Sequence, residues 1–206
     1  MADVSKNGIT VTPSTGSGNT ALSVSATPNR GNRVTQSATF KVATPGDGPS
    51  DQFTANHVAA AEFITPANMN PAVPKDGGQV TITGTSNSPK LTFAPGSGEI
   101  IDGTITTYQA NGSSATSGEA ISGDPGATAS YSWSVNIQTT ENPTIEERTQ
   151  TLVISGDGVD PVTLTLTQAV GDAELSLDQE SVNIPQAGTA QTVQVTTNTT
   201  FTVTAV

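Results

Sequence analysis

Residues able to carry acid–base chemistry are few in this sequence, and none stands in a recognisable catalytic pattern. His57 is the only histidine among 206 residues. A histidine that acts as a general base needs a nucleophile or an acid held beside it by the fold, and its surroundings, "ANHVAAAEF" (55–63), carry no such signature. We therefore expect His57 to lie at the surface or in a linker, without a catalytic role.

Two carboxylate arrangements were weighed for calcium binding and for glycoside cleavage. Asp47 and Asp157 each stand in a Gly-Asp-Gly segment with only two carboxylates nearby, whereas calcium needs several oxygen ligands at set spacing. Hairpin turns explain both segments, because Asp-Gly supplies the positive φ of a tight turn. Glu146 and Glu147 are adjacent, so on a strand they would point to opposite faces rather than flank one cleft. With no cysteine in the chain either, we expect no enzyme activity, no cofactor and no metal.

Three aromatic residues are the candidates for a weak glycan contact, since aromatic rings can stack on sugars. Tyr131 and Trp133 alternate in "YSWSV", and Tyr108 lies in a stretch rich in Gly, Ser and Thr. Alternation puts Tyr131 and Trp133 on one face of a strand, and immunoglobulin-like sandwiches usually bury a tryptophan. Core packing is the favoured interpretation for these two, which leaves Tyr108 as the freer aromatic.

Charge and hydropathy exclude two classes of partner. The formal net charge is −11, and beyond residue 90 the only basic residue is Arg148, so clustered cations for nucleic acid binding are missing. No apolar run approaches the roughly 20 residues of a membrane span. The opening segment "MADVSKNGITVTP" has no apolar signal region, so we expect synthesis in the cytoplasm without secretion.

Alternating apolar and polar residues recur along the chain and predict half-buried antiparallel strands. The clearest segments are "QVTITGT" (79–85), "YSWSVNI" (131–137), "TQTLVIS" (149–155) and "VTLTLTQ" (162–168). The 20 Gly and 13 Pro fall largely between such segments, as turns require. Short strands with turns between them predict an all-β fold of sandwich domains. Residues 55–63 have some helical character, and we interpret them as a distorted strand or a linker.

An internal repeat divides the chain into unequal parts. "PKDGGQVTITGTSNSPKLTF" (74–93) and "PQAGTAQTVQVTTNTTFTVTAV" (185–206) share a Pro-x-x-Gly turn, a strand, a turn containing Asn and a second strand. A second pair, 33–59 and 148–170, shares an arginine, a strand, a Gly-Asp-Gly turn and a strand. We therefore expect a complete immunoglobulin-like domain at 63–171, with an insertion near 94–130. Residues 1–62 read as the second half of such a domain, and residues 172–206 as the first half.

These motifs resemble the BACON-type immunoglobulin-like domain of surface proteins and phage virion proteins from gut Bacteroidetes. The opening of that domain is similar to "LSLDQESVNIPQAG" (175–188) and "NTTFTVTAV" (198–206), its middle to residues 9–42, and its close to "VTLTLTQAVG" (162–171). One departure is that the first copy ends in "FTANHVAAA" instead of a "VTVTQAG-like" strand. The resemblance implies tandem immunoglobulin-like β-sandwiches.

Half a sandwich leaves an apolar face and unpaired strand edges exposed, which favours association. Placing residues 172–206 before residues 1–62 restores the order of the complete unit, within one chain or between neighbours. Because such domains usually have their termini at opposite poles, completion between chains is favoured. Such a contact makes rings or filaments. The proposed seam comprises Asn7, Ile9, Val11, Phe201, Val203 and Val206.

The predicted function is that of a non-enzymatic structural protein of a bacteriophage virion, either a capsid-decorating (auxiliary) protein or a head fibre. The expected partners are copies of the chain or a major capsid protein, with glycans as weak ligands and with neither nucleic acid nor membrane. The expected location is the virion, hence extracellular as part of the particle. Two alternatives stay open: a carbohydrate-binding module of a secreted or surface protein, and a subunit of a self-assembling extracellular filament.

Overall fold

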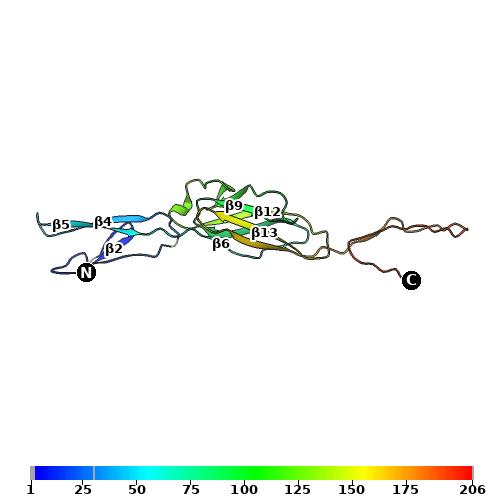
Figure 1. The fold of residues 1–206 in the computed structure, drawn as a ribbon, viewed down its shortest axis with the longest axis horizontal. Helices are drawn as coiled ribbons and strands as arrows, with labels where there is room; N and C mark the ends of the chain where they lie inside the picture. Colours follow the sequence, from blue (N-terminus) through cyan, green and yellow to red (C-terminus); the bar gives the residue numbers. More distant parts are fainter. Residues whose placement is uncertain (1–2, 30, 206) are drawn as a thin grey trace.

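Nearly every regular element is a β-strand in residues 3–29 and 31–205, the part of the chain that the computed structural model describes. The exception is one 3₁₀ turn, η1 (Pro125–Ala127). The predicted all-β, sandwich-type fold class is confirmed. The strands form three parts along one long axis, with the two chain ends at opposite ends of the molecule (Figure 1).

The middle part is a sandwich of two sheets. The five-stranded sheet has the order β11-β10-β12-β8-β6 and consists of β6 (Ile64–Pro66), β8 (Gly78–Ser86), β10 (Thr107–Ala110), β11 (Ser113–Thr116) and β12 (Tyr131–Thr139). The four-stranded sheet has the order β7-β14-β13-β9 and consists of β7 (Ala72–Val73), β9 (Leu91–Pro95), β13 (Arg148–Gly156) and β14 (Val162–Gln168).

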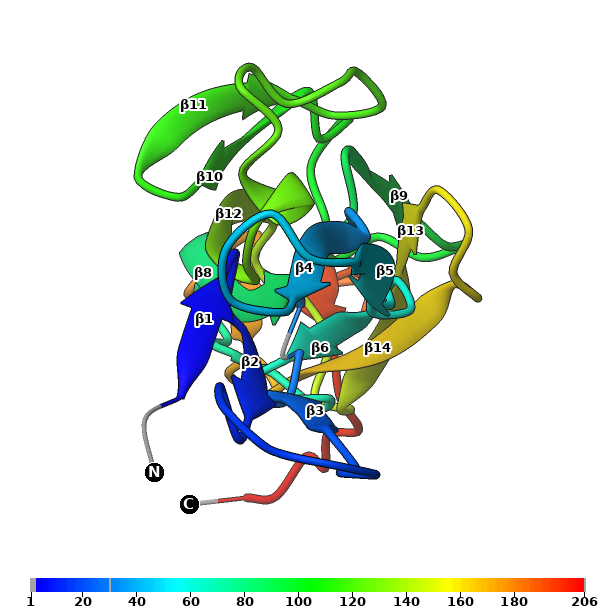
Figure 2. The same ribbon diagram turned by 90° about the vertical axis from the view of Figure 1, so that its left-hand side faces the viewer.

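Alternation along these strands fills one core between the sheets. In β12 every second residue is buried, and Val135 and Ile137 meet Leu152, Ile154 and Leu164 from the facing sheet. The polar residues between them face solvent, as expected for sheets packed on one side. The stretch near 94–130 is ordered on this sandwich, because β10 pairs with β12 and so extends the first sheet (Figure 2).

The first part of the chain contains two small sheets that face each other. Their strands are β1 (Val4–Lys6), β2 (Ile9–Thr12) and β3 (Ser23–Ala26) in one sheet, and β4 (Gln36–Ala43) and β5 (Ser50–His57) in the other. Ile9, Val11, Ala38 and Phe40 form a separate small core between them. β5 ends at His57, and the residues from there to β6 have no helix, so this stretch is a linker.

The last part is open. It has one pair of short strands, β15 (Leu175–Leu177) and β16 (Val195–Thr197), and none of residues 172–205 is buried. Figure 1 shows it running away from the central sandwich on the side opposite to β1–β5. In residues 3–29 and 31–205 no helix has the length and hydrophobicity of a membrane span.

Candidate assembly surface

The ionisable residues that were candidates for catalysis or calcium binding do not lie close to one another in the structure. His57 is half-buried at the end of β5, opposite Gln36, while Asp157 pairs with Lys90 through atoms 2.9 Å apart. Glu146 and Glu147 lie in the exposed loop before β13 rather than on a strand. Within the described residues, no three His, Asp or Glu side chains are grouped as a metal ion would need.

The three aromatic candidates for glycan contact are all buried, and this corrects the expectation for Tyr108. Its strand β10 belongs to the five-stranded sheet, so its ring turns inward and packs 5.1 Å from Phe93 between ring centroids. Its hydroxyl accepts a hydrogen bond from the Leu91 N–H at 3.2 Å. Trp133 packs 5.6 Å from the same Phe93 ring, and the Tyr131 hydroxyl donates to the Ser88 carbonyl at 2.7 Å. None of the three rings is free to stack on a sugar.

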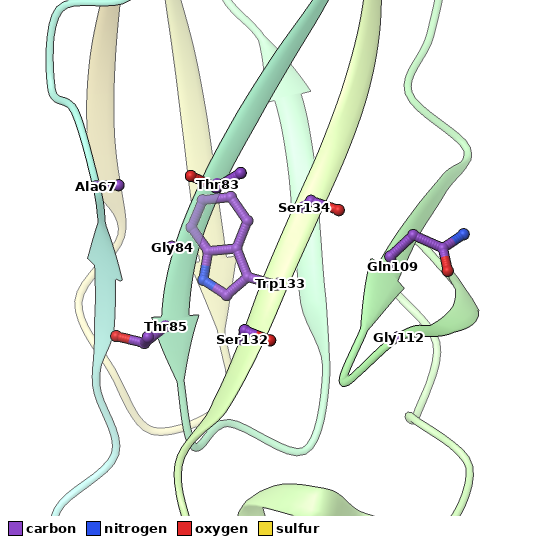
Figure 3. A pocket seen from close by; sticks show the side chains of 9 residues that line it. All are labelled: Ala67, Thr83, Gly84, Thr85, Gln109, Gly112, Ser132, Trp133 and Ser134. Atoms are coloured by element: carbon purple, nitrogen blue, oxygen red, sulfur yellow. The ribbon is translucent and has the colours of Figure 1, made fainter.

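A shallow pocket of about 550 Å³ lies over β8 and β12 (Figure 3). Short hydroxyl side chains of Thr83, Thr85, Ser132 and Ser134 line it, while the Trp133 ring lies over Gly84. None of its nine lining residues is ionisable, so the pocket offers no group for acid–base catalysis.

The unusual feature is the distribution of exposed apolar side chains. Residues 3–62 expose Val4, Leu22, Val24, Val34, Val42 and Val58. Residues 170–205 expose Val170, Leu175, Leu177, Val182, Ile184, Val193, Phe201 and Val203. The larger central sandwich exposes only Met69 and Ile145 among its large hydrophobics. Exposed apolar surface gathered in this way is typical of interfaces.

The last part of the chain repeats the structure of the first half of the central sandwich. Asn198 follows Asn87 by 111 positions (198 − 87), and β15 pairs with β16 in the register that β6 uses with β8: Leu175 with Thr197, as Ile64 with Ser86. The Pro185–Gly188 turn repeats the Pro74–Gly77 turn, with N–H···O distances of 2.8 and 3.1 Å. Residues 172–205 therefore share this strand register and this turn with β6–β8, although only Leu175–Leu177 and Val195–Thr197 among them form strands.

The joints between the parts repeat at a spacing of 111 or 112 residues. The Asn87 side chain donates to the carbonyls of Gly31 and Ala61 at 3.1 and 3.0 Å, and it accepts from the Phe63 N–H at 2.9 Å. The Asn198 side chain donates to the carbonyls of Pro143 and Asp172 at 3.0 and 2.8 Å, and it accepts from the Glu174 N–H at 2.9 Å. The two connections along the chain thus share the same three kinds of asparagine hydrogen bond, although Asn87 is fully buried and Asn198 is only half-buried.

Equivalent residues differ sharply in exposure. Val73 is 2% exposed, but Ile184, 111 positions later, is 66% exposed. Leu91 follows Asn87 by four residues and Phe201 follows Asn198 by three, so we align Phe201 and Val203 with Leu91 and Phe93, although residues 200–205 form no strand. Phe93 is 3% exposed and Val203 is 86% exposed. The missing neighbours are the counterparts of β12, which pairs with β8 in one sheet of the central sandwich, and of β13, which pairs with β9 in the other.

Comparisons with known proteins add only weak likenesses. No family model and no curated protein matches the chain. A GH5 xyloglucanase of Bacteroides ovatus, solved with a XXXG heptasaccharide, matches 54% of this chain at 14% identity with a TM-score of 0.35; the match spans 19% of the enzyme. A Bacteroides thetaiotaomicron protein solved by NMR matches 56% of this chain over 92% of its own length, at 11% identity with a TM-score of 0.28. Likenesses this weak carry no argument about function.

Residues 3–62 lack the counterparts of β8 and β9, and residues 172–205 carry the equivalent stretch of sequence, in which only Val195–Thr197 forms a strand beside β15. β3 is the last strand of its sheet, whereas its counterpart β12 has β8 beside it; β4 pairs only with β5, whereas its counterpart β13 also has β9. The side chains left open include Val24 and Val42. Their counterparts Val135 and Ile154 are fully buried, while Val42 is 51% exposed. The exposed edges of β3 and β4 thus correspond to the edges that β8 and β9 cover in the central sandwich.

The sequence-predicted seam is only partly at this surface. Phe201 and Val203 are exposed as expected. Ile9 and Val11 are 2% and 3% exposed, because they point from β2 into the small core of residues 3–62. They therefore pack beneath the proposed seam and do not form part of its surface. Asn7 lies in the β1–β2 turn and donates to the Ser37 carbonyl at 2.9 Å. Val206 lies outside the described residues.

Proposed function

We propose that the chain is a non-enzymatic structural protein whose copies join end to end, residues 172–205 of one copy completing the open sandwich of residues 3–62 of the next. The observation that carries the proposal is the paired exposure of equivalent residues. Side chains that the central sandwich buries are open in the first and last parts, and each part carries the segment of sequence equivalent to the strands that the other lacks.

The central sandwich supplies the register for the proposed seam. Val135 stands opposite Ile82, and Ile154 stands opposite Phe93. Transferred to the equivalent positions, Val24 meets Val193 and Val42 meets Val203. Pairs of apolar residues directly opposite each other stabilise neighbouring strands, so these four valines form the centre of the seam.

Completion between copies is favoured over closure of one chain on itself. The two open parts lie at opposite ends of the central sandwich, which holds them apart (Figure 1). Charge favours the same pairing: residues 172–206 carry four acids and no base, residues 1–62 carry four of each, and the central part carries ten acids against three bases. Residues 172–206 of one copy, which are acidic, are therefore repelled less by the neutral residues 1–62 of another copy than by the acidic central part of that copy.

The setting supported by the resemblance to virion proteins with BACON-type domains is a bacteriophage particle. There the protein would decorate the capsid or form part of a head fibre, with copies of itself or a major capsid protein as neighbours. Completion by β-strands suits this role, because it adds ladder hydrogen bonds and apolar burial without covalent links.

A pair of variants tests the assembly. In each one, called a capped variant, a charged residue blocks one of the two open ends. Val203→Asp blocks the last part and leaves residues 3–62 open, while Val42→Asp does the reverse. Both positions are exposed in the free chain, so each variant folds. In sedimentation velocity we expect the unmodified chain to form multimers, each variant alone to stay monomeric, and their equimolar mixture to form a 1:1 dimer. A monomeric unmodified chain, or a mixture that does not pair, overturns the proposal.

Cysteine cross-linking tests the register, since the chain has no cysteine of its own. Val42→Cys with Val203→Cys in one chain should give a ladder of disulfide-linked multimers on a non-reducing gel. The matched control joins Val42→Cys with Val170→Cys, an exposed residue outside the proposed seam. Equal ladders from both pairs would contradict the register.

A further inference from the structure

The Pro185–Gly188 turn is formed, but no other described part of the chain packs against its outer side at Gly188. Gly188 has φ +71°, and a Cβ placed there would meet nothing within 4 Å. Its counterpart Gly77 has φ +69°, yet a Cβ there would lie 2.5 Å from the Thr139 carbonyl oxygen and 2.6 Å from that of Thr140. The same turn is therefore seated tightly in the central sandwich and open in the last part of the chain.

Polar groups of the central sandwich surround and bind the Pro74–Gly77 turn; we call this group of residues the seat of the turn. The Gln168 amide donates to the Pro74 carbonyl at 3.0 Å and to the Thr140 carbonyl at 2.6 Å. The Asn142 N–H donates to the Lys75 carbonyl at 2.8 Å. Arg148 holds Gln168 in place by donating to its Oε1 at 2.7 Å. Gln168 is fully buried by these contacts.

Residues 3–62 contain the same seat without a turn in it. Gln36 stands opposite His57 at the end of the β4–β5 pair, as Arg148 stands opposite Gln168 in β13–β14. A second match fixes this equivalence, because the Asn29 side chain donates to the Val58 carbonyl at 3.0 Å as that of Asn142 donates to Ala169 at 2.9 Å. His57 therefore holds the position of Gln168.

A pocket of about 320 Å³ lies at this seat, against residues 128–130 of the central sandwich. Its lining includes Thr27 and Pro28, which precede Asn29 as Thr140 and Glu141 precede Asn142, together with Gln36 and His57. The pocket thus occupies the place that the Pro74–Gly77 turn fills in the complete sandwich.

We propose that this pocket is the receptor for the Pro185–Gly188 turn of a second copy, with the His57 imidazole donating to the Pro185 carbonyl. Gln36 is placed to donate to the other ring nitrogen, as Arg148 donates to Gln168. The inference rests on the proposed end-to-end assembly, and it assigns His57, which acid–base chemistry leaves without a role, as a recognition residue. Gly188 is required because a Cβ has no room at its counterpart Gly77, which backbone carbonyls enclose in the central sandwich.

The test uses the 1:1 dimer of the two capped variants, in which the Val203→Asp chain supplies His57 and the Val42→Asp chain supplies the turn. Each chain carries one histidine, so isotope labelling of the first chain alone makes its His57 ring resonances in NMR report on this pocket. We expect them to shift when the second chain is added. His57→Ala should weaken pairing roughly tenfold, and His57→Gln should restore it, since a glutamine fills this place in the central sandwich.

Gly188→Ala in the second chain should weaken pairing at least as much as His57→Ala. The matched control is Gly103→Ala, which imposes the same strain at φ +76° in open space and should leave pairing unchanged. A dimer that sediments normally with unshifted His57 resonances, and tolerates Gly188→Ala, overturns the receptor assignment while leaving the assembly intact. Failure of the capped variants to pair at all overturns the assembly itself.

Discussion

At the scale of single residues, asparagine side chains hold the parts of the chain together. Asn87 is fully buried, and its amide connects three backbone segments: two carbonyls of the first part and one N–H of the connection. Arg33 strengthens this joint by donating to the Asn87 carbonyl and to the Asp124 carboxylate. A short side chain with both donors and an acceptor can satisfy all these groups at one point.

Asn87→Ala should therefore lower the free energy of unfolding of the joint by about 2–3 kcal/mol, because it leaves two carbonyls and an N–H without partners. Urea denaturation measures the loss, and limited proteolysis between residues 58 and 63 should become faster. Asn136→Ala is the control, since Asn136 is exposed and bonded only to the Thr81 hydroxyl, at 2.7 Å. A loss no larger than that of the control would show that the joint does not depend on Asn87.

The two tyrosines provide a prediction about alkaline pH. Burial raises the pKa of Tyr131 and of Tyr108 above the usual value near 10. Because the folded-state pKa values are raised, their contribution to stability is complete below about pH 10 and is lost as the pH rises further. Absorbance at 295 nm should show both tyrosines ionising only as the sandwich unfolds. Reversible titration near pH 10 in the folded protein would contradict the burial of both rings.

At the scale of elements, β8 and β12 are matched to each other through one glycine. Gly84 stands opposite Trp133, and a Cβ at Gly84 would lie 2.3 Å from Cζ2 of that ring and 2.5 Å from the Thr65 carbonyl oxygen. Neither the indole, packed on Phe93, nor the backbone of β6 can withdraw. The pairing of β8 with β12 therefore requires glycine at position 84, where any side chain would clash.

Gly84→Ala should destabilise the central sandwich by about 1–3 kcal/mol through overpacking. Thr83→Ala, one residue away on the exposed face of β8, should change stability by less than about 0.5 kcal/mol. Thermal unfolding of both variants measures the difference. Equal effects would mean that the ring can move aside.

Alternation in the sequence was sufficient to predict the strands and the inward direction of Trp133 and Tyr131. It could not predict the burial of Tyr108, because β10, besides its hairpin partner β11, pairs with β12 some 25 residues further on, and nothing local shows that second pairing. Ile9 and Val11 were assigned to the seam from their apolar character, which does not reveal the face of β2 that another sheet already covers. The repeat of Asn87 at Asn198 was visible in the sequence, but its meaning as a joint depends on backbone groups of residues 31, 61, 143 and 172.

At the scale of the whole molecule, the two joints decide the shape of any assembly. The Asn87 joint and the Asn198 joint use equivalent backbone groups at nearly equal distances. If the seam closes as proposed, each completed sandwich lies between one joint of each kind. Successive sandwiches are then related by nearly the same rotation and translation. Because the three parts of one copy lie along one long axis (Figure 1), this translation runs along that axis and generates an open filament rather than a closed ring.

Electron microscopy of the assembled chain should therefore show unbranched fibres whose strongest axial repeat is one sandwich, although each copy contributes two. The variant Asn87→Ala with Asn198→Ala should keep the seam, since neither residue lies in it, but should bend the fibre and shorten its persistence length. The doubled repeat should become stronger when only Asn87→Ala is introduced, because alternate joints then differ. Closed rings, or fibres with alternating kinks in the unmodified protein, would show that the joints are not equivalent in the assembly. In that case the common geometry of the two asparagines would belong to the folding of each half-sandwich and not to the design of the fibre.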